Sequence, residues 1–189
     1  MTKNIMIAGV GGQGTLLTSR ILGAALIAQG YDVKVSEVHG MSQRGGSVIT
    51  YVRYGEEVFS PVIEEGQADV ILAFEELEAA RVLTYLNKEG KLLVNMQKLD
   101  PMPVITGAAE YPDDLIGQIS QSVCVMPVNA LQLAEQAGSS KCVNVVMIGR
   151  LAQELEISYD TWIQALRQTV PEKFLELNLR AFELGFRQE

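Results

Sequence analysis

Apolar and polar residues follow two different periods along the chain, and each period predicts a different kind of element. A continuous apolar run over residues 4–9 is typical of a strand that is covered on both faces, and it breaks at glycines. Leucine, isoleucine and alanine then recur at helical spacing over 15–28, and Gly30 supplies a stop. The chain therefore opens with a predicted parallel strand, a glycine loop and a helix of about four turns.

The next segment predicts a second strand over residues 31–38 and then a loop over 39–46, where neither period is present. Residues 47–54 alternate and are rich in β-branched and aromatic side chains, so they predict another strand. The chain can turn after this strand and return over 58–60. We therefore predict a β-hairpin inserted after the second strand.

Strands and helices alternate through the middle of the chain. The pattern predicts three more strands, over 69–74, 91–95 and 123–126, and two helices, over 77–86 and 130–137. Asn129 is the predicted N-cap of the second of these helices, because its side chain can accept from the first free amides. It is also a candidate ligand-binding or interface residue. From residue 143 onward the chain looks helical, with Pro171 at a helix start and an amphipathic end over 174–186.

This alternation predicts an α/β fold, in which a Rossmann-like, mostly parallel sheet has helices on both faces and the C-terminus is helical. The 189 residues fit one domain, because a single hydrophobic core stays efficient at this length. Hydrophobic residues make up 48% of the chain and charged residues 20%, which is typical of an ordinary globular domain. We therefore expect one domain over residues 1–189.

Net charge and cysteine content narrow the function classes. The formal charge of -8 argues against nucleic acid, whose binding needs clustered Lys and Arg. The start of the chain passes directly into the first strand without room for a signal peptide, and no apolar run approaches a membrane span, so we expect a cytoplasmic protein. Cys124 and Cys142 lack any CxxC spacing, so we predict two small buried apolar residues and no metal site in this chain.

The glycines after the first strand form the first candidate site. Between a predicted strand and a predicted helix, the GxGxxG pattern comprises Gly9, Gly11, Gly12, Gln13 and Gly14. Amides at such a helix start can hold a phosphate or another anion. Glu37 follows about 20 residues later, where a dinucleotide-binding fold places its ribose-binding acid. NAD or FAD binding and simple tight packing of strand on helix both stay open, although no segment offers an obvious hydride-transfer site.

The loop over residues 39–46 is the second candidate site, because it gathers polar side chains and glycines at the end of a strand. Its candidate residues are His39, Gly40, Ser42, Gln43, Arg44, Gly45 and Gly46. Ligands of open α/β sheets collect beyond the carboxyl ends of strands, so this loop and the glycine loop should lie side by side. Arg44 could clamp a carboxylate or a phosphate with its forked guanidinium, whereas a lone histidine in a glycine loop is more often structural.

Acidic residues gather after the strand that ends at Phe74. Glu75, Glu76 and Glu78 could do acid/base chemistry, or they could simply place negative charge at a helix N-terminus. We favour the second interpretation.

The segment over residues 36–48, SEVHGMSQRGGSV, closely resembles the small (beta) subunit of the indolepyruvate:ferredoxin oxidoreductases. That subunit is similar to the gamma domain of pyruvate and 2-oxoglutarate ferredoxin oxidoreductases. The resemblance covers nearly the whole chain, because it extends to residues 9–14, 127–131, 144–149 and 178–183.

This resemblance implies a two-subunit enzyme that oxidatively decarboxylates an aryl 2-oxoacid, uses coenzyme A and passes electrons to ferredoxin. It places thiamine diphosphate and the iron–sulfur clusters in the large subunit, and this chain should be inactive alone and able to self-associate. We carry over no catalytic residue. The glycine loop and the loop with Arg44 are carried over as ligand-binding or interface elements, and the latter is expected near the entrance for coenzyme A or the 2-oxoacid. The alternatives are a free-standing NAD- or FAD-binding protein and a non-catalytic assembly subunit.

Overall fold

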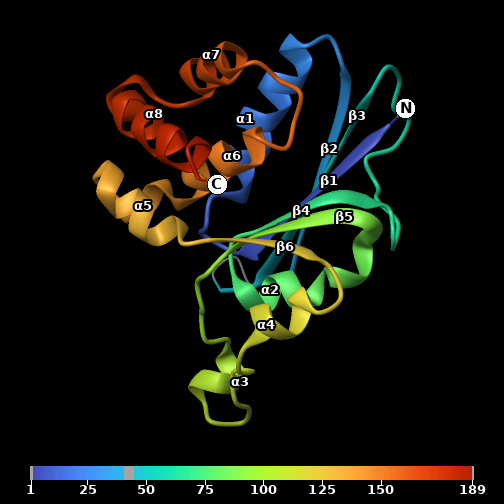
Figure 1. Ribbon diagram of the computed structural model, residues 1–189, viewed down its shortest axis with the longest axis vertical. Helices are drawn as coiled ribbons and strands as arrows, with labels where there is room; N and C mark the ends of the chain where they lie inside the picture. Colours follow the sequence, from blue (N-terminus) through green and yellow to red (C-terminus); the bar gives the residue numbers. More distant parts are fainter. Residues whose placement is uncertain (1, 41–44, 189) are drawn as a thin grey trace.

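The computed structural model describes residues 2–40 and 45–188, and six strands form one mixed sheet in it (Figure 1). The strands are β1 (Lys3–Val10), β2 (Asp32–His39), β3 (Ser47–Gly55), β4 (Ala68–Ala73), β5 (Leu86–Asn95) and β6 (Cys124–Val128). Their order across the sheet is β2-β3-β1-β4-β5-β6. The neighbours from β1 to β6 pair in parallel, whereas β3 is antiparallel to both β1 and β2. The predicted α/β fold with a mostly parallel sheet is therefore confirmed.

The structure has a β-hairpin, but it is not the one predicted from residues 47–54 and 58–60. Residues 58–60 are not a strand; the hairpin consists of β2 and β3 instead, and β3 lies between β2 and β1. Because β3 has a full ladder on both sides, it has no free edge for a returning strand. Side chains hold the following segment instead: Arg53 donates to the carbonyl oxygens of Ser60 and Val62, both at 3.0 Å, and Asp32 accepts from the amide of Val58 at 2.9 Å.

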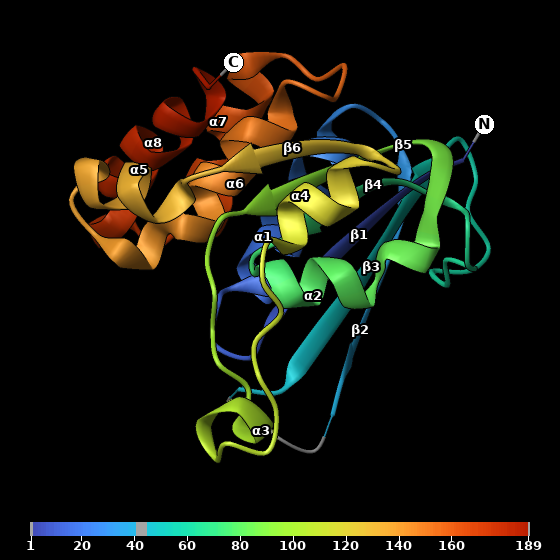
Figure 2. The ribbon, with the colours of Figure 1, turned by 60° about the horizontal axis from the view of Figure 1, so that its bottom comes forward.

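Helices cover both faces of the sheet (Figure 2). They are α1 (Thr15–Ala28), α2 (Glu76–Arg81), α3 (Met102–Ile105), α4 (Leu115–Ser120), α5 (Ala130–Ala137), α6 (Val143–Ala152), α7 (Tyr159–Thr169) and α8 (Glu172–Phe186), with 3-10 turns η1 (Leu83–Tyr85) and η2 (Ser140–Cys142). Helix α1 and the helices from α5 to α8 lie on one face, and α2 and α4 lie on the other. Among the described residues, no helix is long and apolar enough to cross a membrane.

Two local predictions are wrong in detail. The helix predicted over 77–86 ends earlier, because Leu86 already pairs with Ala68 in the sheet and must be extended. Cys142 is buried as predicted, but Cys124 is exposed. It lies on β6, the last strand of the sheet, where residues are covered on fewer sides.

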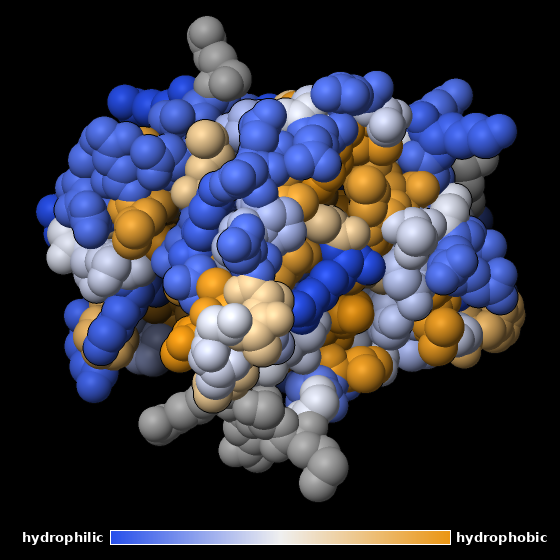
Figure 3. All heavy atoms as spheres, turned by 90° about the horizontal axis from the view of Figure 1, so that it is seen from below, coloured by the Kyte–Doolittle hydropathy of each residue, from blue (hydrophilic) through white to orange (hydrophobic). Residues whose placement is uncertain are grey.

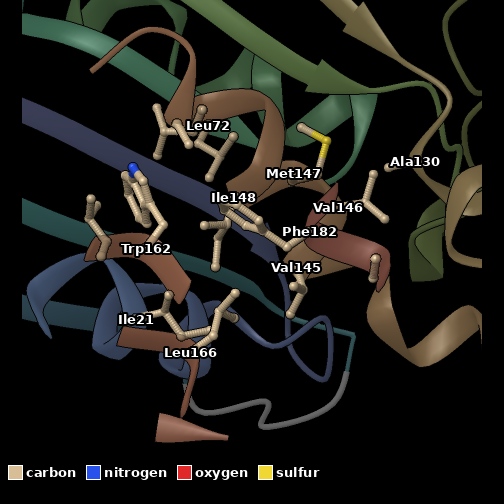
Figure 4. Packing of buried hydrophobic residues seen from close by; sticks show 14 of the residues in the cluster. Ile21, Leu72, Ala130, Val145, Val146, Met147, Ile148, Trp162, Leu166 and Phe182 are labelled. Atoms are coloured by element: carbon tan, nitrogen blue, oxygen red, sulfur yellow. The ribbon is translucent and has the colours of Figure 1, made fainter. Parts of the chain in front are cut away.

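The larger core lies between the sheet and the helices α1, α5, α6, α7 and α8, and Figure 4 shows its centre. Trp162 and Phe182 are both fully buried there, with ring centroids 6.1 Å apart. Helices α6 and α8 approach closely, because Gly149 and Gly185 have no side chain between the two backbones: a Cβ at Gly185 would stand 1.9 Å from the carbonyl oxygen of Val146. This close packing fixes the distance between α6 and the C-terminal half of α8.

The contact between α6 and α8 leads to a stability prediction. Replacing Gly185→Ala forces the helices apart, and we expect it to lower the free energy of unfolding by about 1–3 kcal/mol, as overpacking does. The matched control is Gly23→Ala in the interior of α1, where an added Cβ meets nothing within 4 Å and should stabilise the helix by about 0.5–1 kcal/mol. Urea unfolding of both variants measures the difference. Equal stability of the two variants would contradict the close approach of α6 and α8.

Candidate functional site

The two loops singled out in the sequence meet beyond the carboxyl end of β1. The amide of Gly11 donates to the carbonyl oxygen of Gly46 at 2.8 Å, so the glycine loop and the end of the 39–46 loop are in direct contact. Gly12, Gly14 and Gly45 have positive φ values of 104°, 84° and 74°, which favour glycine. Ser42, Gln43 and Arg44 lie outside the described residues.

The glycine loop is held in place by the side chain of Gln13. Its Oε1 accepts from the amide of Val10 at 2.7 Å, and its Nε2 donates to the carbonyl oxygen of Phe74 at 3.1 Å. Asn95, which is fully buried, donates to the same oxygen at 3.1 Å and accepts from the amide of Ala130 at 3.1 Å. Gln13 was a ligand candidate, but here its amide group is occupied within the fold. Asn95 was missed, although a polar residue that ends an apolar strand could have indicated it.

Two further sequence predictions concern helix starts. Asn129 caps α5, because its Oδ1 accepts from the amide of Gln132 at 3.4 Å, which confirms its predicted role. Glu75 likewise caps α2 by accepting from the amide of Glu78 at 2.9 Å. The Glu78 carboxylate accepts from the hydroxyl of Ser47 and pairs with Arg81 at 2.9 Å.

A first cavity of about 380 Å³ lies on the β2 side of the glycine loop. It is lined by Gly11, Gly12, Gly14, Thr15, Leu16, Glu37, His39 and Val48, so it brings together Glu37, His39 and the glycines. The carboxylate of Glu37 accepts from the hydroxyls of Thr15 at 3.4 Å and Thr50 at 3.2 Å. Because β3 separates β2 from β1, Glu37 is not on the strand next to β1, where a dinucleotide-binding fold has its acid.

A second cavity of about 400 Å³ lies on the opposite side of the same loop, where three helices begin. Its lining residues are Gly12, Gln13, Gly14, Leu17, Ser139, Lys141, Cys142, Asn144, Val170, Pro171, Phe174, Leu177 and Asn178. Gly14, Cys142 and Pro171 are the N-cap residues of α1, α6 and α8, and none of them provides a side-chain cap. Both other helices of eight residues or more among the described residues, α5 and α7, have one. We call this space the three-helix cavity.

The three-helix cavity should attract anions. The helix dipoles place partial positive charge at each N-terminus, and Lys141 is the charged side chain among the described lining residues. Asn144 and Asn178, which are 4% and 7% exposed, add polar groups to the cavity. Asn178 donates to the carbonyl oxygen of Phe174 at 2.8 Å, and the Nδ2 atom of Asn144 lies 3.5 Å from the carbonyl oxygen of Gly14. The cavity therefore combines a positive end with hydrogen-bonding groups.

An apolar wall completes this cavity, formed by Leu17, Val170, Phe174 and Leu177. Burial raises the pKa of the Cys142 thiol, so the sulfur stays protonated and is a poor nucleophile. The arrangement fits an organic anion with an apolar body better than it fits covalent catalysis. Sequence analysis missed this cavity, because its walls come from segments that are far apart along the chain and that individually look like ordinary helix starts.

Comparison with known proteins decides the family. Residues 4–188 match the family described as pyruvate ferredoxin/flavodoxin oxidoreductase. The chain belongs to this family. Its resemblance to the small subunits of oxoacid:ferredoxin oxidoreductases, inferred from the sequence, is confirmed.

Two curated relatives of this oxidoreductase family are similar to the chain over nearly its full length. The indolepyruvate oxidoreductase subunit IorB of Thermococcus kodakarensis is 45% identical over 96% of this chain and 93% of its own length. The protein of the same name from Archaeoglobus fulgidus is 42% identical over 100% of this chain and 96% of its own length.

Solved structures of the family share the fold. The gamma subunit of a keto/oxoacid ferredoxin oxidoreductase from Geobacter sulfurreducens has a TM-score of 0.73 and 25% identity, with 97% of this chain and 96% of that chain covered. A 2-oxoglutarate:ferredoxin oxidoreductase from Magnetococcus marinus has a TM-score of 0.75 and 23% identity. The match covers 98% of this chain but only 30% of the Magnetococcus marinus chain, so the part that resembles this protein is one region of a longer polypeptide.

The role of Gln13 in holding the glycine loop can be tested. We expect Gln13→Ala to lower the free energy of unfolding by about 1–3 kcal/mol, because two hydrogen bonds of about 0.5–1.5 kcal/mol each are lost. The amide of Val10 should also exchange faster with solvent. Gln29→Ala is the control, since that exposed side chain makes one hydrogen bond, to Thr161. If both variants have the same stability and the same exchange rate at Val10, Gln13 does not hold the loop.

Proposed function

We propose that this chain is the small subunit of a thiamine-dependent, indolepyruvate-type 2-oxoacid:ferredoxin oxidoreductase. In this role it supports the oxidative decarboxylation of aryl 2-oxoacids to acyl-coenzyme A by a large partner subunit, with ferredoxin as the electron acceptor. Full-length relatives at 45% and 42% identity that carry the indolepyruvate oxidoreductase name support this assignment. The observation that carries it in the structure is the three-helix cavity beside the glycine loop, a place for an organic anion.

The residues that this chain has indicate which cofactors belong to the partner subunit. Its two cysteines are too few for an iron–sulfur cluster, which normally takes about four thiolates, so we place the clusters and the thiamine diphosphate in the large subunit. Thiamine diphosphate supplies the electron sink for the decarboxylation. This chain contributes binding and shelter from water, and we place the assembled complex in the cytoplasm.

The residues of the three-helix cavity suit coenzyme A, which the family resemblance implies as co-substrate. Its phosphate groups would face the N-termini of α1, α6 and α8 and the ammonium group of Lys141. The apolar wall, with Phe174 and Leu177, would contact the less polar part of the molecule. The 39–46 loop would contact the large subunit near the entrance for coenzyme A or the 2-oxoacid, and Arg44 is the residue of this loop that we propose for binding a carboxylate or a phosphate.

The proposed function is tested by leaving this chain out. We expect a co-expressed pair of subunits to reduce an electron acceptor in a reaction that depends on both the 2-oxoacid and coenzyme A, and the large subunit alone to lose most of this activity at matched cofactor content. If the large subunit alone had full activity, this chain would have only an assembly role. Micromolar binding of NAD, NADP or FAD to the isolated chain in calorimetry would favour a dinucleotide-binding protein, for which Glu37 and the first cavity are the supporting features.

The cavity assignment predicts a specific kinetic change. Lys141→Ala in the co-purified complex should raise the apparent KM for coenzyme A about tenfold, the effect of losing one charge-assisted hydrogen bond of about 1.5 kcal/mol, and leave the KM for the 2-oxoacid unchanged. Lys88→Ala is the matched control, because Lys88 is an exposed lysine near the start of β5, at the other end of the strand from Asn95. An unchanged KM for coenzyme A in Lys141→Ala would argue against this cavity as its site.

A further inference from the structure

The chain between β5 and α4 projects from the body of the protein, with α3 at its tip (Figures 1 and 2). We call residues 98–111 the arm. Both of its ends are fastened to the start of α2 by Glu75, which is 1% exposed. The carboxylate of Glu75 accepts from the amide of Leu99 at 3.1 Å and from the hydroxyl of Tyr111. The arm therefore has a closed and fixed base.

Tyr111 strengthens this base. Its hydroxyl oxygen accepts from the amide of Leu77 at 3.1 Å, and Lys98 lies over its ring with the ammonium nitrogen 5.5 Å from the ring centre. Burial and the hydrogen bond to Glu75 raise the pKa of Tyr111, so its hydroxyl stays a proton donor at neutral pH.

The tip of the arm is ordered by its own backbone. The amide of Ile105 donates to the carbonyl oxygen of Pro101 at 3.1 Å, and the amide of Ala108 donates to that of Pro103 at 2.8 Å. Pro101 and Pro103 each fix one φ angle. None of the residues of α3 is buried, so the tip is stiff without having a core of its own.

The tip nevertheless exposes apolar side chains. Met102 and Ile105 are both 65% exposed, and residues 101–109 contain no charged residue. Figure 3 looks at the molecule from below, the side on which α3 projects in Figure 1, and shows apolar atoms at the surface among hydrophilic ones. A stiff apolar projection is typical of a segment that inserts into a partner, because the conformational entropy of the segment is already lost before it binds.

Two observations indicate which partner the tip fits. Exposed acidic residues stand on both sides of the tip, namely Asp100, Glu110 and Asp113. Together with the net charge of -8, they disfavour a second copy of this chain and favour a basic surface. Leu99 at the base of the arm lines two cavities of about 290 Å³ and 350 Å³ that also contain glycine-loop residues, so the arm is continuous with the candidate site.

We propose that the arm inserts Met102 and Ile105 into an apolar pocket with a basic rim on the large subunit of the same enzyme. This inference rests on the proposed function, because it needs that subunit to exist. The arm then anchors the small subunit at the end of the sheet where the glycine loop and the three-helix cavity lie. The fixed base at Glu75 links the docked tip to that site.

The test uses Ile105→Asp in the full-length chain. The isolated variant should keep the melting temperature of the wild type, because the side chain is exposed. Its dissociation constant for the large subunit should rise at least tenfold, as expected for a central apolar anchor. Ile105→Leu should retain binding. Phe59→Asp is the matched control, since Phe59 is 86% exposed away from the arm and should bind as the wild type does.

Each outcome of this test has one meaning. If the wild type binds the large subunit and Ile105→Asp binds equally well, the docking inference fails while the proposed function stands. If the wild type itself does not bind, both fail. If Ile105→Asp abolishes self-association of the isolated chain in sedimentation and leaves the two-subunit complex intact, the tip contacts a second copy and the inference is overturned.

Discussion

Two amide side chains donate to one carbonyl oxygen and so hold together the end of the protein where the candidate site lies. Gln13 and Asn95 both donate to the oxygen of Phe74, the residue after β4, and Asn95 also accepts from the first amide of α5. The glycine loop, the ends of β4 and β5 and the start of α5 are thereby connected through buried or half-buried hydrogen bonds. In a poorly solvated site such bonds are costly to leave unmade, so the four segments are constrained to one relative arrangement.

The three-helix cavity depends on a second constraint, which comes from packing. Helices α6 and α8 pack closely because Gly149 and Gly185 place no side chain between their backbones. Trp162 and Phe182 fill the adjoining core. Three helix N-termini lie beside this packed core, and their partial charges add at a cavity that Lys141 also lines.

The candidate binding cavities gather at one end of the molecule, around the glycine loop. The glycine loop separates two cavities, one beside Glu37 and one beside α8, and the base of the arm lines two more. This concentration of binding surface supports the proposed role as a subunit that completes the site of a larger enzyme. Because the base of the arm and the glycine loop line the same two cavities, docking of the arm would be geometrically coupled to the glycine loop.

The sequence by itself determined the parts that local forces govern. The strand, glycine loop and helix over residues 4–28, the cap at Asn129, the acidic helix start at residues 75–78 and most later elements follow from periodicity and helix-end chemistry, which act over a few residues. The family was also evident in the sequence: the 36–48 segment and four other segments carry the resemblance, and the family match over residues 4–188 confirms it.

Tertiary structure alone decided the features that join distant segments. Only the paired sheet places β3 between β2 and β1 and leaves residues 58–60 outside any strand, because ladder partners are chosen by the whole sheet. Cys124 is exposed because β6 is the last strand of the sheet, which its apolar sequence does not indicate. The three-helix cavity joins residues 12 and 178, and the arm is fastened through Glu75 and Tyr111, 36 positions apart. Such contacts carry no local signature, since they depend on how the helices pack and not on the residues next to them in the chain.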